Sequence, residues 1–286
     1  MKKLIILLFC GVVCLTGCTK GSELEPEGYI MTMTTKYSNV YIAMYGTGSV
    51  IIDWGDGTPK EMYEFTASLY SINLYINHYY SKPIEHTIKI IGKNIEKLFV
   101  DNITTLDVSN NPKLKLLNCY FCQFTTLDVS NNPELTSLSC SFSQLTTLDV
   151  SNNTELTSLF LKSNQLTSLD VSKNINLTYL NCTNNRLTNL DVSKNTELSI
   201  LACEYNELTS LNMNGNAKLN LLYCMGNQLS ATALNDLFES LHSNILENSP
   251  WEKGISMFDN PGWDDCNVKI AKDKGWSLYP IRDFAY

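Results

Sequence analysis

The feature that most constrains this chain is a repeat with a fixed period of 21 residues, which begins near residue 107. The repeated segment reads Asp-Val-Ser-Asn-Asn or Asp-Val-Ser-Lys-Asn, and a weaker copy starts at Asn212. Self-similarity at one period, without insertions, predicts a solenoid in which each unit stacks on the next. The full copies start at Asp107, Asp128, Asp149, Asp170 and Asp191.

Apolar residues recur at every 21st position, in columns headed by Leu114, Leu117, Phe124, Leu127 and Val129. One unit cannot bury its own apolar face, so the stack as a whole forms the core. Each inward leucine then contributes roughly 1.5–3 kcal/mol. Asparagine columns headed by Asn111 and Asn164 are predicted to satisfy backbone groups where the chain turns.

Both ends of the array show signs of caps. Residues 98–103 look like a shortened repeat. At the other end Ser230 is suited to begin a helix with Leu234, Leu237 and Phe238 on one face. Residues 255–260 then repeat the strand spacing, and a short helix is predicted from about Asp265 to Lys274. We therefore expect repeats over 94–229 and capping repeats over 230–286.

Three columns in the predicted strands point away from the core, toward the concave side of the solenoid. They vary while the core positions repeat, and they hold aromatic and apolar residues with few charges. That is the composition of an interface core, although a single exposed aromatic residue is ordinary. About nine strands would give a face roughly 40 Å long. The predicted partner-binding residues are Leu116, Tyr120, Phe160, Tyr179, Ile200, Leu221, Tyr223 and Met225.

Cysteine also follows the period. Five cysteines share one inward column, in which Leu161 takes the third place, so we predict buried free thiols rather than disulfides. Cys122 completes a Cys-x-x-Cys pair but stands in the column otherwise held by asparagine. No second pair supplies the other ligands of a zinc site. The predicted ladder is Cys119, Cys140, Cys182, Cys203 and Cys224.

Metal binding and catalysis find little support in the sequence. The repeated Asp column suggests calcium, but each Asp precedes Ser by two residues, a spacing better suited to turn hydrogen bonds. His78, His86 and His242 are scattered, with no recognisable nucleophile or metal-ligand spacing. We therefore expect no cofactor, no metal and no enzymatic activity; a hydrolase with an unrecognised site is the weakest alternative.

Residues 29–93 differ in kind from the repeats. Short β-branched or aromatic runs over 29–35, 40–44, 49–53 and 87–91 predict a small all-β domain. The hairpin Asp53-Trp-Gly-Asp-Gly-Thr58, followed by His78-Tyr-Tyr80, resembles the PKD-like immunoglobulin-type sandwich. That resemblance covers roughly 65 residues and implies a spacer or an interaction module.

The first residues have the zones of an export signal: Lys2 and Lys3, an apolar run from Leu4 to Leu15, and small residues before Cys18. Leu-Thr-Gly-Cys18 also resembles the lipobox of bacterial lipoproteins. The resemblance implies a signal peptide over 1–17, lipidation at Cys18 and a polar acylated tether over 18–28. Simple secretion is the alternative.

The unit Leu-x-x-Leu-x-Cys-x-x-Asn-x-Leu is that of a leucine-rich repeat, with short parallel strands on the concave face and mostly turns on the convex face. The 21-residue cysteine ladder resembles the internalin family, most closely the internalin J type, whose members are adhesins and host-contact proteins. A lipobox and a leading β domain depart from Gram-positive internalins. They resemble surface lipoproteins of gut Bacteroidetes, so no internalin ligand is carried over.

The net charge of the chain limits the class of molecule that it can bind. The net charge is −8, and loss of Lys2 and Lys3 with the leader leaves 19 basic and 29 acidic residues, or −10. Such a surface disfavours nucleic acid. We expect an exported lipoprotein on the outer membrane, exposed at the cell surface, that touches the membrane only through its lipid. It would bind a host or bacterial surface protein through the concave face, with a glycan in nutrient capture as the second reading.

Overall fold

The structure is a computed structural model, and it describes residues 28–65, 74–244 and 252–279. The predicted signal peptide, Cys18 and nearly all of the tether lie outside these residues. Within them the strands form two sheets, one of five strands and one of 11. Neither described helix is long and apolar enough to cross a bilayer.

The N-terminal part is built from eight strands. Buried and less buried residues alternate in β1 and β3, which therefore bury one face each. Both strands have the predicted bounds, and β7 overlaps the shortened repeat predicted over 98–103, whereas β4, β5 and β8 were not predicted as strands. The bounds are β1 Tyr29–Thr35, β2 Asn39–Gly46, β3 Ser49–Asp53, β4 Glu61–Glu64, β5 Leu74–Tyr79, β6 His86–Gly92, β7 Ile95–Asp101 and β8 Thr105–Asp107.

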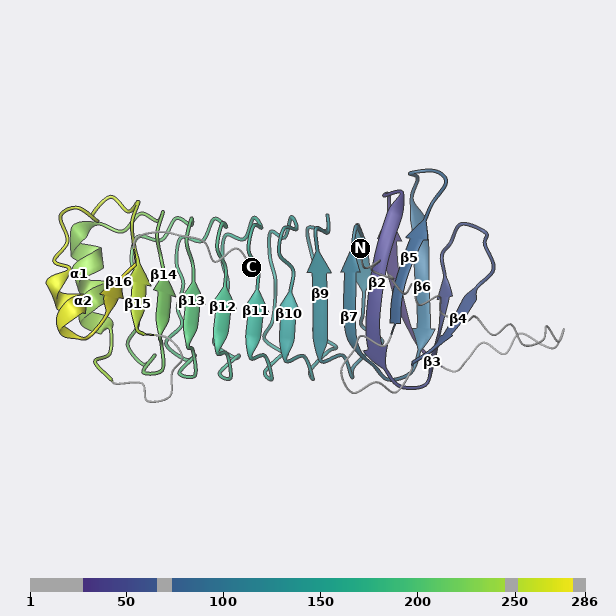
Figure 1. Cartoon of the computed structure of the whole chain (residues 1–286), viewed down its shortest axis with the longest axis horizontal. Coiled ribbons are helices and arrows are strands. Elements are labelled where there is room, and N and C mark those ends of the chain that lie inside the picture. Colours follow the sequence, from purple (N-terminus) through teal and green to yellow (C-terminus); the bar gives the residue numbers. More distant parts are fainter. Residues whose placement is uncertain (1–27, 66–73, 245–251, 280–286) are drawn as a thin grey trace, which may run out of the picture.

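The repeats form a ladder of short parallel strands that lie side by side (Figure 1). Each strand pairs in register with the equivalent residues of the next repeat, as Leu138 does with Leu159. The 21-residue period is therefore one turn of the solenoid, and the fold is of the leucine-rich-repeat kind. The strands are β9 Leu116–Tyr120, β10 Ser137–Ser139, β11 Ser158–Phe160, β12 Tyr179–Asn181, β13 Ile200–Ala202 and β14 Leu221–Tyr223.

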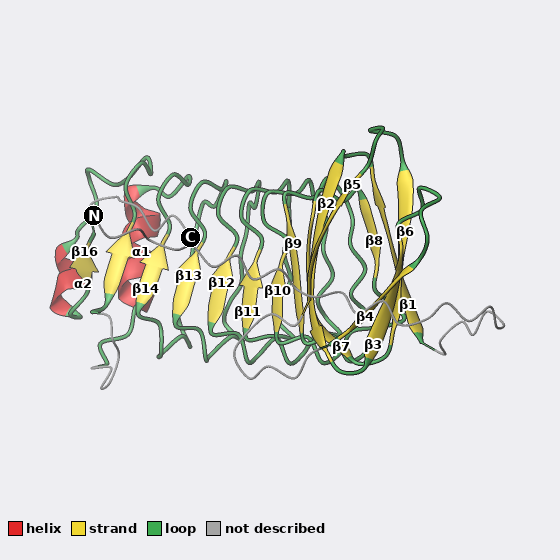
Figure 2. Cartoon of the chain, turned by 45° about the vertical axis from the view of Figure 1, so that its right-hand side comes forward, coloured by secondary structure: helices red, strands yellow, loops and turns green. Residues whose placement is uncertain are grey.

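The N-terminal strands and the solenoid share both sheets. Strand β7 pairs parallel with β9 and antiparallel with β2, so β2 and β5 extend the solenoid sheet. The first solenoid turn supplies β8, which pairs with β1 and so becomes an edge of the other sheet, β4-β3-β6-β1-β8 (Figure 2). One apolar core runs through both parts. The sheets therefore show an all-β end fused to the solenoid, and a separate PKD-like domain remains a prediction.

The two asparagine ladders satisfy backbone groups, as expected, but in different ways. In the ladder that starts at Asn111, each later Nδ2 donates to two carbonyls of the preceding turn. Asn174 Nδ2, for example, lies 3.0 Å from Val150 O and 2.9 Å from Asn153 O. The Oδ1 atoms of this ladder are buried and accept no hydrogen bond from the described residues.

The ladder that starts at Asn164 uses both ends of the amide. Asn185 Oδ1 accepts the Leu166 N–H at 3.0 Å, while Nδ2 donates to Leu161 O and Cys182 O. The same pattern holds at Asn206 and Asn227. These side chains thus form hydrogen bonds with backbone N–H and C=O groups that lack a backbone partner in the irregular turns.

The C-terminal end closes with α1 Ala231–Ser240, β15 Gly254–Ser256, α2 Lys269–Asp273 and β16 Ser277–Leu278 (Figure 1). Ser230 caps α1 by accepting the Ala233 N–H, and Leu234, Leu237 and Phe238 are buried, as predicted. Helix α2 is shorter than expected, because the chain turns through residues 263–268. There the Asn267 N–H donates to Asn235 Oδ1 at 2.7 Å.

Candidate functional site on the strand face

The outward side of the 11-stranded sheet, called the strand face below, is the predicted concave face. In-register pairing sets its side chains in columns, since alternate residues of a strand point to opposite sides. Leu116 lies beside Ser137, then Ser158 and Tyr179. The inward residues between them, such as Leu117 and Leu138, are fully buried. The core therefore fixes where each outward side chain stands.

The strand face holds a depression of about 380 Å³ over β9 to β12. Its size is that of the smaller ligand pockets of proteins, but it lies open along a sheet. Aromatic rings provide much of the lining, with serine and asparagine side chains between them. The lining residues are Phe99, Leu116, Leu117, Asn118, Tyr120, Ser137, Ser139, Ser141, Phe142, Phe160, Lys162, Tyr179 and Asn181.

The rings of the depression contact one another edge to face. Phe160 and Tyr179 have centroids 4.8 Å apart with their planes at 78°. Tyr120 meets Phe121 at 4.6 Å and 87°, and its centroid lies 5.4 Å from that of Phe142. This geometry is favourable for aromatic pairs and holds the rings in place without a ligand.

Six of the eight predicted partner-binding residues are half-buried on the strand face. They are Leu116, Tyr120, Phe160, Tyr179, Ile200 and Tyr223, and four of them line the depression. The prediction that Leu221 and Met225 are exposed is wrong, since only 6% and 7% of their surfaces remain accessible. Leu221 pairs with Gly254, and the Tyr279 ring lies where a side chain at Gly254 would stand. Met225 lies in the column between Glu204 and Phe258, where the backbone bonds to both neighbouring turns.

Several residues of the strand face were not found from the sequence. Phe99 and Phe142 line the depression. Beyond Phe99 the face continues over β2, where Tyr45 lies 6.0 Å from the Phe99 ring, and reaches β5, where Tyr41 contacts Tyr75. Phe99 had a usable signal, because residues 98–103 resemble a repeat. Phe142 directly follows an outward column of the repeats, so the period could have located it as well. The tyrosines depend on the long-range pairing of β2 with β5 and β7.

Three aromatic residues of the repeats occupy a strained backbone position. One residue per repeat, directly after the outward column of Tyr120, has a left-handed conformation. Phe121, Phe142 and Tyr205 adopt it with φ of 53°, 57° and 52°. Large side chains rarely tolerate this region, which costs about 1–3 kcal/mol and often marks functional sites. Phe142 lines the depression and Phe121 packs against it, whereas the Tyr205 ring lies beside Gly226 in the next repeat.

Charged groups are sparse on the solenoid part of the strand face. Lys162 Nζ lies 5.7 Å from the centre of the Phe142 ring. Glu204 stands in the same column two repeats further on, and its Oε2 accepts the Thr183 hydroxyl at 2.6 Å. Burial raises the pKa of Glu204, although Thr183 and Lys162 oppose this effect. The outward columns over β9 to β14 therefore carry one cation and one poorly hydrated carboxylate, two repeats apart. Strand β7 adds Lys97 and Asp101 beside Leu116 and Tyr120.

The cysteine ladder lies inward of the strand face. The five ladder cysteines are fully buried and form no disulfide; they are Cys119, Cys140, Cys182, Cys203 and Cys224. Cys122, with 1% of its surface exposed, is also a free thiol. Burial raises the pKa of Cys182 to about 12, and the charge of Glu204 adds to the rise. A thiol in this state is a poor nucleophile.

The aspartate column lies on turns away from the strand face. In each repeat Oδ1 accepts the N–H of the serine two residues later, at 2.8–2.9 Å. This is the turn geometry expected from the spacing. The described residues contain no group of three His, Cys, Asp or Glu residues that could hold a metal ion.

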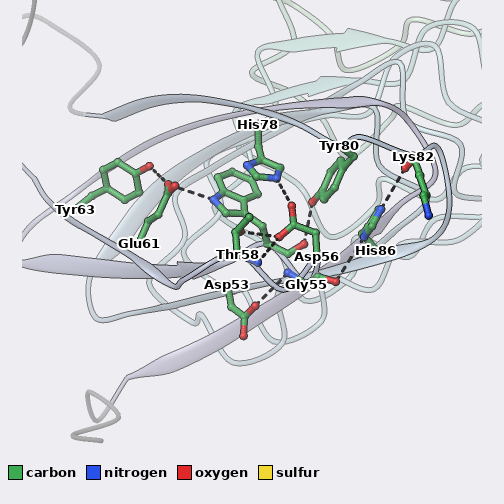
Figure 3. A network of polar contacts seen from close by, with 11 residues as sticks. Asp53, Gly55, Asp56, Thr58, Glu61, Tyr63, His78, Tyr80, Lys82 and His86 are labelled. Atoms are coloured by element: carbon green, nitrogen blue, oxygen red, sulfur yellow. Dashed lines mark hydrogen bonds and ion pairs between the residues drawn. The ribbon is translucent and has the colours of Figure 1, made fainter. Parts of the chain in front are cut away.

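A second polar cluster lies in the N-terminal strands, where the fold brings together two histidines that seemed scattered (Figure 3). The Trp54 ring stacks on His78 at 4.3 Å, and Tyr80 stacks on His86 at 4.1 Å. His78 Nε2 lies 2.8 Å from Asp56 Oδ2.

Asp56 and Tyr80 have hydrogen-bond partners inside this cluster. Thr58 donates through its N–H and hydroxyl to Asp56 Oδ1, and the Tyr80 hydroxyl donates to Trp54 O. Burial alone would raise the pKa of Asp56, but bonds from Thr58 and His78 outweigh it and lower the pKa to about 2. The cluster thus pins the Asp56-Gly-Thr58 hairpin to β5.

Comparison with known proteins finds similarity among solved structures. No protein-family model matches the chain, and no curated protein matches it. The functional domain of InlJ from Listeria monocytogenes, which includes a cysteine ladder, is 31% identical over 66% of this chain and 51% of its own, with a TM-score of 0.45. A leucine-rich-repeat protein of Leptospira interrogans is 18% identical over 66% and 53%, with a TM-score of 0.49.

The LRIM1/APL1C complex gives 24% identity over 54% of this chain and 27% of that chain, with a TM-score of 0.43. The chain thus spans about half the length of the InlJ and Leptospira structures. The repeat fold itself follows from the in-register strand ladder described above.

Proposed function

We propose that this chain is an exported lipoprotein, anchored to the outer membrane through Cys18, that binds another protein through the strand face. The observation that carries the proposal is the aromatic depression of about 380 Å³ over β9 to β12. Rings of Tyr, Phe and Trp held on a rigid sheet are the usual centre of protein interfaces. The acidic surface disfavours nucleic acid.

The edge-to-face ring pairs favour a protein over a glycan as the ligand. A sugar chain stacks on several open ring faces in a row, whereas here Phe160 and Tyr179 pack edge to face and Lys162 lies over Phe142, so the rings do not present an unbroken row of open faces. We assign the N-terminal strands to a PKD-like module, supported by the Trp54, His78 and Tyr80 cluster. Its five-stranded sheet would act as the N-terminal cap of the solenoid.

A binding screen tests the proposal. The full chain in mild detergent is offered to an array of extracellular proteins and, in parallel, to a glycan array. We expect saturable protein hits that the double change Tyr120→Ser and Phe160→Ser abolishes. The matched control is Ile175→Ser, which removes an exposed apolar side chain outside the strand face.

Protein hits that survive the double change would refute the strand face as the binding site. Glycan hits alone would move the function to nutrient capture. Metabolic labelling with a fatty acid tests the anchor separately, since Cys18→Ala must abolish incorporation if Cys18 carries the lipid.

A further inference from the structure

The strand face has a polar spot just beyond the C-terminal end of the depression. Its floor is Ala202, a small residue between Asn181 on β12 and Tyr223 on β14. Tyr179 stands diagonally from Ala202, and Glu204 follows Ala202 by two residues in the same repeat. Ala202, Glu204, Tyr179 and Tyr223, called the seat below, thus combine a small side chain with two tyrosines and one carboxylate on the strand face.

Glu204 is the charged group of this seat. Its Oε2 accepts the Thr183 hydroxyl at 2.6 Å, and within the described residues it forms no ion pair. Lys162 is nearby in the column, but its ammonium group lies over the Phe142 ring. Burial raises the pKa of Tyr179 and Tyr223, and the charge of Glu204 adds to the rise in both. Within the described residues Glu204 therefore lacks a direct ionic partner.

A poorly hydrated carboxylate beside aromatic rings is suited to a cation. Removal of water weakens the solvation of the charge, and an incoming cation restores the lost interaction. The faces of tyrosine rings attract ammonium and guanidinium groups as well. A planar guanidinium can stack on a ring and donate to the free carboxylate oxygen at once.

We propose that Glu204, Tyr179 and Tyr223 receive an arginine or lysine side chain of the protein segment that occupies the depression. The inference rests on the proposed function, because the segment must already lie on the strand face. Charge complementarity extends beyond the seat, since the chain carries a net charge of −8 and favours basic partners. The partner is thus a protein whose bound segment presents a basic residue next to apolar ones.

A phage-displayed random peptide library is the probe. It is selected in separate arms against the full chain, Glu204→Gln, Glu204→Lys and Glu207→Gln. Glu207 is exposed and lies outside the strand face, so Glu207→Gln controls for the loss of one negative charge. A further arm uses the Tyr120→Ser and Phe160→Ser chain, which tests the depression alone.

We expect the unaltered chain and Glu207→Gln to select peptides with arginine or lysine at a fixed distance from apolar residues. Glu204→Gln should lower the affinity of these peptides by roughly 10-fold or more, as expected for a lost hydrogen-bonded charge. Glu204→Lys should select acidic residues at that position. Glu204→Gln also removes a desolvated charge, so its melting temperature should stay equal or rise, which separates lost binding from lost fold.

The outcomes distinguish the two proposals. Peptides that need Tyr120 and Phe160 but show no basic preference, or bind Glu204→Gln equally well, overturn the cation seat and leave the proposed function standing. Peptides that bind regardless of Tyr120 and Phe160, or no selection at all, count against the proposed function itself.

Discussion

The two asparagine ladders differ in whether Oδ1 accepts a hydrogen bond, and this difference predicts a difference in stability. Asn174→Ala and Asn185→Ala remove the same buried side chain from two ladders of the same solenoid. Asn174→Ala deletes two Nδ2 bonds to carbonyls, and Asn185→Ala deletes three, of which the bond to Thr183 O is the longest at 3.4 Å. All five of those carbonyls keep another donor, namely the Asn153, Leu156 and Ser163 N–H groups or the side chains of Asn164 and Asn206.

The contrast lies in Oδ1. Asn185 Oδ1 accepts the buried Leu166 N–H, so Asn185→Ala orphans that group at a cost of about 1–3 kcal/mol. Asn174 Oδ1 has no partner among the described residues, so Asn174→Ala also removes an unsatisfied acceptor. We expect Asn185→Ala to lower the free energy of unfolding by about 2 kcal/mol more than Asn174→Ala.

Equilibrium urea denaturation, followed by circular dichroism, measures the difference at equal slopes. Amide hydrogen exchange offers a local check, because Asn185→Ala should lower protection at Leu166 and Asn174→Ala should not. An equal loss in both variants, or a larger loss in Asn174→Ala, would refute the argument from unsatisfied groups.

Three further predictions follow from the turns, the left-handed residues and the ladder. Bonds from the backbone and hydroxyl of the following serine lower the pKa of Asp149, Asp170 and Asp191; the folded chain then binds these protons less tightly than the unfolded chain. The stabilisation by these three carboxylates is present above about pH 4 and is lost as the pH falls through their lowered pKa values. The midpoint of urea denaturation should therefore fall at acid pH, and it should fall less steeply in Asp149→Asn. A midpoint that does not change with pH would contradict this prediction. Phe142→Asn should relieve the strain of the left-handed backbone and change the free energy of unfolding by less than about 1 kcal/mol, yet weaken partner binding. The control Ser163→Asn, at the equivalent backbone position, should leave partner binding unchanged. Maleimide labelling with mass spectrometry should modify Cys266 in the native chain and reach the buried ladder only on unfolding; rapid native labelling of Cys182 would contradict the buried-thiol assignment.

Much of the solenoid was predictable because its period is visible in the sequence. Once Leu117, Leu138 and Leu159 are assigned to one inward column, the register and the outward neighbours follow from the alternation of side chains along a strand. The Ser230 cap and the apolar face of α1 are equally local. Such features depend on residues a few positions apart or on an unbroken repeat.

The remainder depends on contacts between distant segments. Nothing local shows that β2 pairs with β7 across about 50 residues, so the extension of the strand face over Tyr41, Tyr45 and Tyr75 was missed. The burial of Leu221 depends on where the Tyr279 ring packs. The gathering of His78 and His86 around Tyr80 likewise requires β5 and β6 to lie in different sheets.

The alternation of inward and outward residues in each repeat allows two kinds of sequence change. The inward leucine, cysteine and asparagine columns carry the fold, while outward residues contact their neighbours mainly across the surface. Duplication or loss of one 21-residue unit would lengthen or shorten the strand face by a single strand spacing, about 4.8 Å, without a new core. Substitution of outward residues would thus change the ligand, and addition of repeats would fit the face to a longer ligand. In both cases the inward columns that determine the fold stay the same.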